Sequence, residues 1–170
     1  MKDAGPGAPL PTDRRSTNEE MWEATERVID MAVLCDDLGY DSYWLAEHHF
    51  QYEGYEVVPN GILLGAVIAE RTQRIRIGMA FNVVPQWHPL RLAEDFATAD
   101  ILTGGRVIFG VGRGYHSREV DSFGVPSTLT DNDANREIFE EQVEVMMKAF
   151  NEESFSHEGK HYKLPPEVPY

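Results

Sequence analysis

The sequence predicts an α/β fold in which parallel strands alternate with helices. Three observations predict it. Apolar residues recur at helical spacing in several long segments, short apolar runs stand between those segments, and glycine or proline separates one kind of segment from the other. Strands that alternate with helices in this way form right-handed parallel βαβ units.

The first helix is predicted to begin at Asn18, an N-cap residue that two glutamates follow. Residues 1–18 are rich in Pro, Gly and Ala, so we expect a flexible leader before a folded domain over residues 19–170. Gly39 stands where a left-handed residue would end the helix. Spacings of three and four predict a buried stripe made of Met21, Ala24, Val28, Met31, Ala32, Cys35 and Leu38.

The remaining elements follow in regular alternation. The predicted strands are Tyr40–Ala46, buried on both faces, Ile75–Val84 and Arg106–Val111. The predicted helices are residues 62–71, Leu90–Leu102, and a long one that Asn132 or Asp133 caps and that runs to Phe150. A polar loop is expected from Gly114 to about Asp131, and a small hairpin over Ser154–Leu164. Three strands do not close a barrel, so the pattern indicates a small open sheet or part of something larger.

Composition excludes several classes of function. The chain of 170 residues has 15 Lys+Arg and 29 Asp+Glu, a net charge of −14, which disfavours binding to nucleic acid or to anionic membranes. The single cysteine, Cys35, offers neither an intrachain disulfide nor a zinc cluster. No transmembrane run or signal-peptide block is visible, so we expect a cytoplasmic protein.

The carboxyl ends of the three predicted strands carry the polar candidates. Ligands of parallel α/β folds lie at these ends. The first strand leads into Glu47-His48-His49, the second ends around Ala80-Phe81-Asn82, and the third opens into Gly112-Arg113-Gly114-Tyr115. We therefore expect these three segments to face one pocket.

Each candidate has a functional and a structural interpretation. Alternation along an extended segment places Glu47 and His49 on one side and His48 on the other, which does not match a zinc-protease motif. His48 suits general acid–base chemistry, although a hydrogen-bonded histidine at the loop mouth fits the pattern equally. Arg113 between glycines suits a phosphate, although an ordinary glycine turn with a surface arginine fits as well.

Other polar residues favour structural roles. Glu119 and Asp121 lie in the polar loop, which predicts a solvated face. His157 and His161 flank the turn of the predicted hairpin and are expected to be structural.

Two long stretches together resemble the bacterial-luciferase-like family of flavin monooxygenases. They read DDLGYDSYWLAEHHF and QWHPLRLAEDFATADILTGGRVIFGVGRGYHSREVDSFGV, and the similarity runs from about Asn18 to the end of the chain. The resemblance implies a TIM (β/α)8 barrel, usually a dimer, so that a homo-oligomer is expected. It also implies reduced FMN that a separate flavin reductase supplies. Such enzymes use oxygen to oxidise an aldehyde or another small organic substrate.

The resemblance also implies roles for particular residues. His48 matches the acid–base histidine beside the flavin, and Arg113 matches the arginine that binds the FMN phosphate, with the backbone of Tyr115 next to it. Ala80-Phe81 matches a cis peptide under the flavin ring. Glu47 and Glu119 match acidic positions near the pocket, to which Asn82 is adjacent.

Two alternatives stay open within this resemblance. A related branch is a reductase that uses a deazaflavin for hydride transfer, and a non-catalytic chain could act as the scaffold partner of a full-length homologue. The leader stands where the family has its first strand, and the chain ends where the fifth strand would begin. We therefore expect a partial barrel with unpaired edges, which folds loosely, associates through those edges, or forms part of a longer polypeptide.

Overall fold

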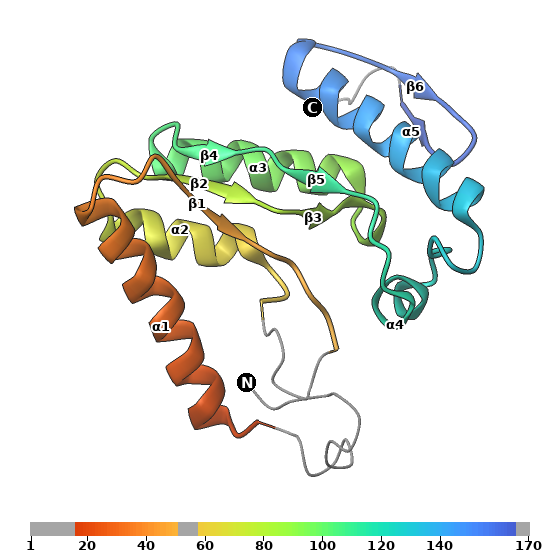
Figure 1. The fold of residues 1–170 in the computed structure, drawn as a ribbon. Helices are drawn as coiled ribbons and strands as arrows, with labels where there is room; N and C mark the ends of the chain where they lie inside the picture. The colour runs from red at the N-terminus through yellow and green to blue at the C-terminus, as the bar shows by residue number, and fades with distance from the viewer. Residues whose placement is uncertain (1–15, 51–57, 166–170) are drawn as a thin grey trace, which may run out of the picture.

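The computed structural model describes residues 16–50 and 58–165 (Figure 1). Most of the predicted leader, residues 1–15, lies outside the described residues, and Asn18 already belongs to the first helix. The helices are α1 (Asn18–Asp37), α2 (Gly61–Arg71), α3 (Pro89–Thr103), α4 (Ser117–Val120) and α5 (Asn132–Asn151). Single 3-10 turns cover Val84–Gln86 and Asp121–Phe123. The strands are β1 (Ser42–Leu45), β2 (Arg76–Met79), β3 (Asn82–Val83), β4 (Val107–Ile108), β5 (Val111–Gly112), β6 (His157–Glu158) and β7 (Lys163–Leu164).

The main sheet is parallel, as the alternation of helices and strands predicts. Its strand order is β1-β2-β4, with Tyr43 opposite Ile77 and Ile77 opposite Val107. Beyond this sheet the chain continues as a second parallel pair, β3 with β5. Helices α2 and α3 lie side by side along the sheet, with α1 packed against α2 and α5 packed against α3 (Figure 1). The arrangement is a series of parallel β/α units around an open sheet.

The core lies between the sheet and helices α2 and α3. Ile77 of β2 is fully buried and meets Ile68 of α2 and Leu92 of α3 in one apolar cluster. Helix α2 approaches the strand closely at Gly65, where a Cβ would lie 3.1 Å from Ile77 Cγ2. The opposite face is open among the described residues: Trp44 is 47% exposed. The prediction that the first strand is buried on both faces is therefore wrong for this segment.

Capping fixes the start of both long helices earlier in the chain than predicted. Thr17, not Asn18, is the N-cap of α1, because its hydroxyl accepts the N–H of Glu20 while the Glu20 carboxylate accepts the N–H of Thr17. Asp131, not Asn132 or Asp133, caps α5 and accepts the N–H of Ala134 at 3.0 Å.

The buried face of α1 is narrower than its apolar stripe. The described structure buries Ile29, Ala32 and Asp36, while Met31 and Leu38 are exposed. The predicted end of the helix is confirmed, since Gly39 follows the last turn with a φ of +86°.

Asp36 ties the end of α1 to the start of β2. Its carboxylate accepts the backbone N–H groups of Gln73 at 2.7 Å, Arg74 at 3.1 Å and Ile75 at 2.7 Å. The bond from Gln73, with those from Ile75 and Arg74, holds the pKa of the Asp36 carboxyl below its usual range despite burial. A buried carboxylate is tolerated here because three donors satisfy it.

Two of the predicted strands are each split in two. Ile75–Val84 divides into β2 and β3 around a cis peptide bond between Ala80 and Phe81. Arg106–Val111 divides into β4 and β5 at Gly110, where any Cβ would collide with the carbonyl of Met79.

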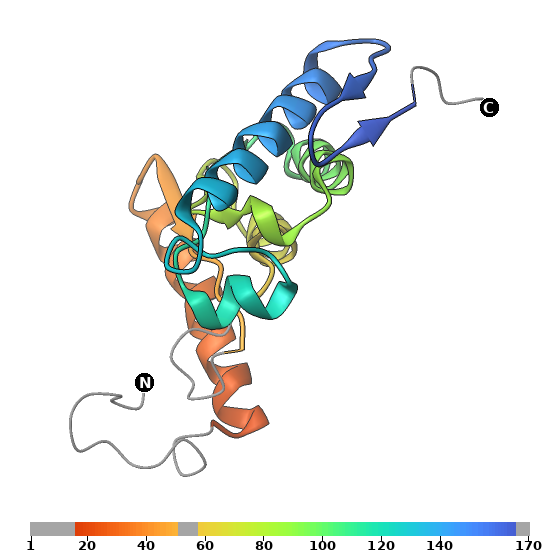
Figure 2. The ribbon, with the colours of Figure 1, turned by 90° about the vertical axis from the view of Figure 1, so that its right-hand side faces the viewer.

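The C-terminal half contains one unpredicted helix. The segment expected as a polar loop includes α4 and the turn Asp121–Phe123. The predicted hairpin is confirmed as β6 and β7, which pair antiparallel with His157 opposite Leu164. Figure 2 shows α5 and this hairpin at the end of the molecule opposite the N-terminal half of α1. Within the described ranges, no helix is long and apolar enough to cross a membrane.

Candidate functional site

A cavity of about 480 Å³ lies beyond the carboxyl ends of the parallel strands, where the fold class predicts a ligand. The segments after β1, between β2 and β3, and after β5 all contribute to its wall. The predicted site residues that line it are Glu47, His48, Ala80, Phe81, Arg113, Tyr115 and Glu119. The expectation that the three strand ends face one pocket is therefore confirmed.

His48 is paired with a buried carboxylate. Its Nδ1 lies 2.8 Å from Glu119 Oε1, and the two side chains are 19% and 3% exposed. The backbone N–H of His48 donates to the carbonyl of Val58 at 3.1 Å, which fixes the loop that carries the ring. The prediction of a solvated face for Glu119 is wrong, because α4 turns this side chain inward toward the cavity.

Glu47, in the same loop, is buried and accepts hydrogen bonds from several parts of the protein. It accepts hydrogen bonds from Trp87 Nε1 at 3.0 Å and from the backbone N–H of Val83 at 3.2 Å. His49 Nε2 lies 2.8 Å from the same carboxylate, and the amide of Asn82 also donates to it. Asn82 is buried beneath the cavity rather than lining it, so its place is to support the wall.

The wall between β2 and β3 exposes an aromatic ring. Phe81 follows the cis bond after Ala80 and is 57% exposed at the cavity. Gly112 lies against it, where an added Cβ would be 3.1 Å from Phe81 Cβ. The cis geometry is the one that the sequence resemblance implies at this position.

The turn after β5 is tightly packed. Gly114 has a φ of +69°, and a Cβ there would lie 2.5 Å from Val83 Cγ1 and 2.8 Å from Val120 Cγ2. Both the backbone conformation and the space therefore require glycine. The carbonyl of Arg113 accepts a hydrogen bond from Asn135 Nδ2 at 3.2 Å, which anchors the turn to α5.

Two side chains of this turn offer donors to a ligand. The Arg113 guanidinium donates to Asn132 Oδ1 at 3.3 Å on the exposed side and lines the cavity. His116 also lines the cavity, and its Nδ1 is buried without a hydrogen-bond partner. A guanidinium beside an imidazole suits an anionic group such as a phosphate.

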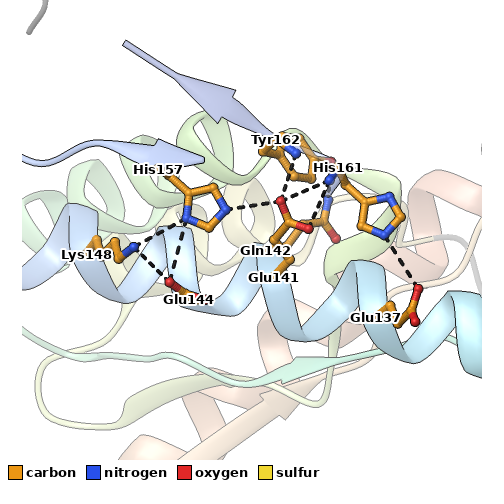
Figure 3. A network of polar contacts seen from close by, with 8 residues as sticks. All are labelled: Glu137, Glu141, Gln142, Glu144, Lys148, His157, His161 and Tyr162. Atoms are coloured by element: carbon orange, nitrogen blue, oxygen red, sulfur yellow. Dashed lines mark hydrogen bonds and ion pairs between the residues drawn. The ribbon is translucent and has the colours of Figure 1, made fainter. Parts of the chain in front are cut away.

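A second polar cluster lies between α5 and the hairpin (Figure 3). The carboxylate of Glu141 accepts the backbone N–H groups of His161 and Tyr162 and lies 3.1 Å from His157 Nε2. Burial raises the pKa of the Glu141 carboxyl, but these three donors together hold it below its ordinary value. None of these residues lines the cavity, so their contacts hold the hairpin on the helix.

The cavity has the size of a small-molecule site. Its volume falls within the range of ligand pockets, roughly 300–1,000 Å³. Within residues 16–50 and 58–165, no group of three or more His, Cys, Asp or Glu could hold a metal ion.

The fold and the cavity are those of α/β-barrel proteins that bind a small molecule at the carboxyl ends of their strands. Among these, the chain belongs to the luciferase-like monooxygenase family, whose profile matches residues 7–169. Members of this family are oxidoreductases.

Curated relatives align with the greater part of the chain. The protein y4vJ of Sinorhizobium fredii is 36% identical over 153 residues, which are 90% of this chain and 42% of that protein. The alkanal monooxygenase alpha chain of the Kryptophanaron alfredi symbiont is 30% identical over 84% of this chain and 38% of its own. The oxygenase component of the flavin-dependent trigonelline monooxygenase of Acinetobacter baylyi is 31% identical over 64% and 30%. The chain thus spans less than half the length of these relatives.

Solved structures share the fold. The oxygenating constituent of 3,6-diketocamphane monooxygenase from Pseudomonas putida, in complex with FMN, is 27% identical with a TM-score of 0.75, covering 91% of this chain and 41% of that one. The monooxygenase RslO1 from Streptomyces bottropensis is 29% identical with a TM-score of 0.79, covering 90% and 45%. The coenzyme F420-dependent tetrahydromethanopterin reductase of Methanopyrus kandleri, 23% identical with a TM-score of 0.64 over 84% and 41%, shows the same fold. The matching structures confirm the predicted partial TIM barrel.

Proposed function

We propose that the protein is a flavin-dependent monooxygenase that uses reduced FMN and oxygen on an aldehyde or another small organic substrate. One observation carries the proposal: His48, Phe81 and Arg113, which come from three different strand ends, line a single cavity. These three residues offer what a site for FMN requires: an acid–base group near the reacting atoms, an apolar wall for the flavin ring and a cation for the phosphate.

The residues present fit FMN. Arg113 would bind the phosphate, and the packing of Gly114 against Val83 and Val120 holds the turn that carries it. His116 Nδ1 is a buried polar atom in the same wall that a polar ligand would satisfy. Phe81 and the backbone at Tyr115 would lie against the cofactor.

The protein's own groups would then act around the cofactor. Reduced FMN, when bound, supplies the electrons that activate oxygen. His48 would hold or release a proton beside the reacting atoms, since imidazole changes charge near neutral pH. The Ala80-Phe81 segment would exclude water from one side of the site. The hydrogen bond from the Val83 N–H to the Glu47 carboxylate would hold that segment in place.

The proposal extends to partners and location. Because a relative is an oxygenase component, we propose that a separate flavin reductase supplies the reduced FMN. We further propose a cytoplasmic homo-oligomer. Exposed apolar side chains on the outer helices, including Leu63 of α2 and Leu102 of α3, are consistent with assembly.

Anaerobic titration with reduced FMN, followed by flavin fluorescence, tests the proposal. The wild-type protein should bind, and Arg113→Ala should weaken binding about 10- to 100-fold through the lost charged hydrogen bonds. Arg27→Ala is the matched control, because it removes the same charge from the exposed face of α1. Oxygen uptake with a long-chain aldehyde then tests turnover.

Other outcomes select the alternatives. Binding of a deazaflavin in place of FMN would replace the proposal with a deazaflavin-dependent reductase. Binding of neither cofactor, with pairing to a full-length homologue, would replace it with a scaffold role. Equal losses in Arg113→Ala and Arg27→Ala would overturn the assignment of the phosphate anchor.

A further inference from the structure

We infer that Glu119 is a positioning residue that fixes which nitrogen of His48 carries the exchangeable proton in the cavity. The geometry of the pair stands on its own, whereas its consequence for turnover rests on the proposed function. The assignment gives a specific task to a carboxylate that sequence reasoning placed in a solvated loop.

The contact itself dictates the tautomer. An ionised carboxylate only accepts hydrogen bonds, so the 2.8 Å contact between Glu119 Oε1 and His48 Nδ1 requires the hydrogen on Nδ1. The neutral ring then has its lone pair on Nε2, and this nitrogen is the one that gains and loses a proton.

The element that carries Glu119 is held in place from two sides. Val120 packs beside Gly114 of the Arg113 turn, and Asp121 Oδ1 accepts the N–H of Ser127 at 3.1 Å. Thr130 Oγ1 donates to the same oxygen at 3.3 Å. These contacts fix the position of helix α4, and with it the position of the Glu119 side chain.

The loop that carries His48 makes a second contact, with the 3-10 turn that follows helix α4. The ring of His49 meets Phe123 edge-on at 5.1 Å between centroids, and Phe50 lies 5.4 Å from the same ring. Phe50 adopts a φ of +59°, which a residue with a side chain rarely does. One polar contact, from His48 to Glu119, and one aromatic contact, from His49 to Phe123, thus connect the same two segments.

The other carboxylate of the site has a different set of partners. Glu47 is bonded to His49, Trp87, Val83 and Asn82, all of them groups of the protein framework. Glu119 instead pairs with the histidine that lines the cavity. The two acidic residues near the pocket therefore have different roles. Glu47 stabilises the cavity wall formed by the segment around Val83, and Glu119 orients the imidazole ring of His48.

The tautomer of His48 is measurable without any cofactor. Long-range ¹H–¹⁵N correlation spectra of the histidine-labelled protein report which ring nitrogen is protonated, and a His48→Gln spectrum assigns the signal. We expect the Nδ1–H tautomer in the wild type, a shift toward Nε2–H in Glu119→Ala, and retention of Nδ1–H in Glu119→Asp. Glu141→Ala is the matched control, since it should alter the signals of His157 and leave those of His48 unchanged.

Turnover provides the second measurement. With reduced FMN supplied, Glu119→Ala should lower kcat at least about tenfold through loss of acid–base efficiency, and Glu119→Asp should recover much of it. The affinity for FMN should stay within about twofold, because Glu119 is not the phosphate anchor.

The outcomes are separable. A wild-type His48 with the hydrogen on Nε2, or an unchanged tautomer in Glu119→Ala, would overturn the inference even if FMN binds. The predicted tautomers in a protein that binds no flavin would sustain the geometric inference while ending the proposed function. If Glu119→Ala does not fold, the wild-type tautomer and Glu119→Asp still decide the matter.

Discussion

Two of the histidine–glutamate pairs among the described residues, His48–Glu119 and His157–Glu141, have similar chemistry and opposite surroundings. His48 and Glu119 lie 2.8 Å apart and line the cavity, whereas His157 and Glu141 lie 3.1 Å apart and are closed between α5 and the hairpin (Figure 3). Each carboxylate is largely buried, and each pair joins segments far apart in the sequence. The distance between the partners therefore does not distinguish them.

The partners of each carboxylate do distinguish them. Glu141 also accepts two backbone N–H groups of the hairpin, so its charge is used to hold a turn. Glu119 belongs to a four-residue helix that faces a ligand-sized cavity. The pair at the cavity is therefore accessible to a ligand, whereas the pair at the hairpin holds the hairpin on α5.

The largest expected effect comes from removing the imidazole at the cavity. His48→Ala should lower turnover with reduced FMN by about 10²- to 10⁴-fold, the usual contribution of general acid–base catalysis. His157→Ala should leave turnover unchanged, because its ring does not reach the cavity. Steady-state oxygen uptake compares the two variants. Equal losses in both would remove the distinction between the pairs.

The packing behind the cavity turn can be tested at Gly114. Gly114→Ala should destabilise the protein by about 2–4 kcal/mol, the sum of a left-handed backbone cost and overpacking against Val83 and Val120. Gly124→Ala is the control, since its φ is also positive but no atom lies within 4 Å of an added Cβ. Urea unfolding of both variants measures the difference. A control that loses as much as Gly114→Ala would show that space at Gly114 is not limiting.

The contacts of Glu141 with the β6–β7 hairpin should affect the free energy of unfolding and not the binding of FMN. Glu141→Ala should lower the free energy of unfolding by about 1–3 kcal/mol, because it removes the acceptor of the His161 and Tyr162 N–H groups and the partner of the buried His157 ring. Glu137→Ala removes an exposed pair with Lys160 and should cost less than about 1 kcal/mol. FMN binding should be unchanged in both variants. A loss of FMN affinity in Glu141→Ala would show that the two regions are coupled.

The smallest expected effect is the loss of stability at acid pH that comes from the contacts of Glu141. Burial raises the pKa of Glu141, but the bonds from His161, Tyr162 and His157 outweigh it, so the folded pKa lies below the ordinary value of 4.5. The stabilisation is therefore present above pH 4.5 and is lost as the pH falls through the folded pKa. Urea midpoints of the wild type should fall more over this range than those of Glu141→Gln. Parallel curves would contradict the assignment.

Elements with strong local signals could be predicted from the sequence. Two glutamates in the first turn and Gly39 at the end marked α1 in the sequence, and the structure confirms both. The strand-end rule brought His48 and Arg113 to one cavity without any knowledge of packing. These predictions depend on backbone geometry, which local sequence dictates.

What could not be predicted depends on tertiary contacts. Helix α4 has only four residues, SREV, and no apolar period of its own, so nothing local indicated that Glu119 would be buried. Asn82 was placed near the pocket, yet its partner Glu47 lies 35 positions away and draws it beneath the wall. The exposed Met31 and Leu38 of α1 show that a period predicts a helix without revealing what covers its face.

The position of Asp36 makes α1 a helix anchored at one end. Its buried residues, Ile29, Ala32 and Asp36, all lie in the second half, whereas Trp22 near the start is 65% exposed. Fraying from the N-terminal end costs little where few apolar contacts are broken. Amide protons should therefore exchange with solvent in a gradient along α1, fastest in its first turns and slowest in the turn that holds Asp36.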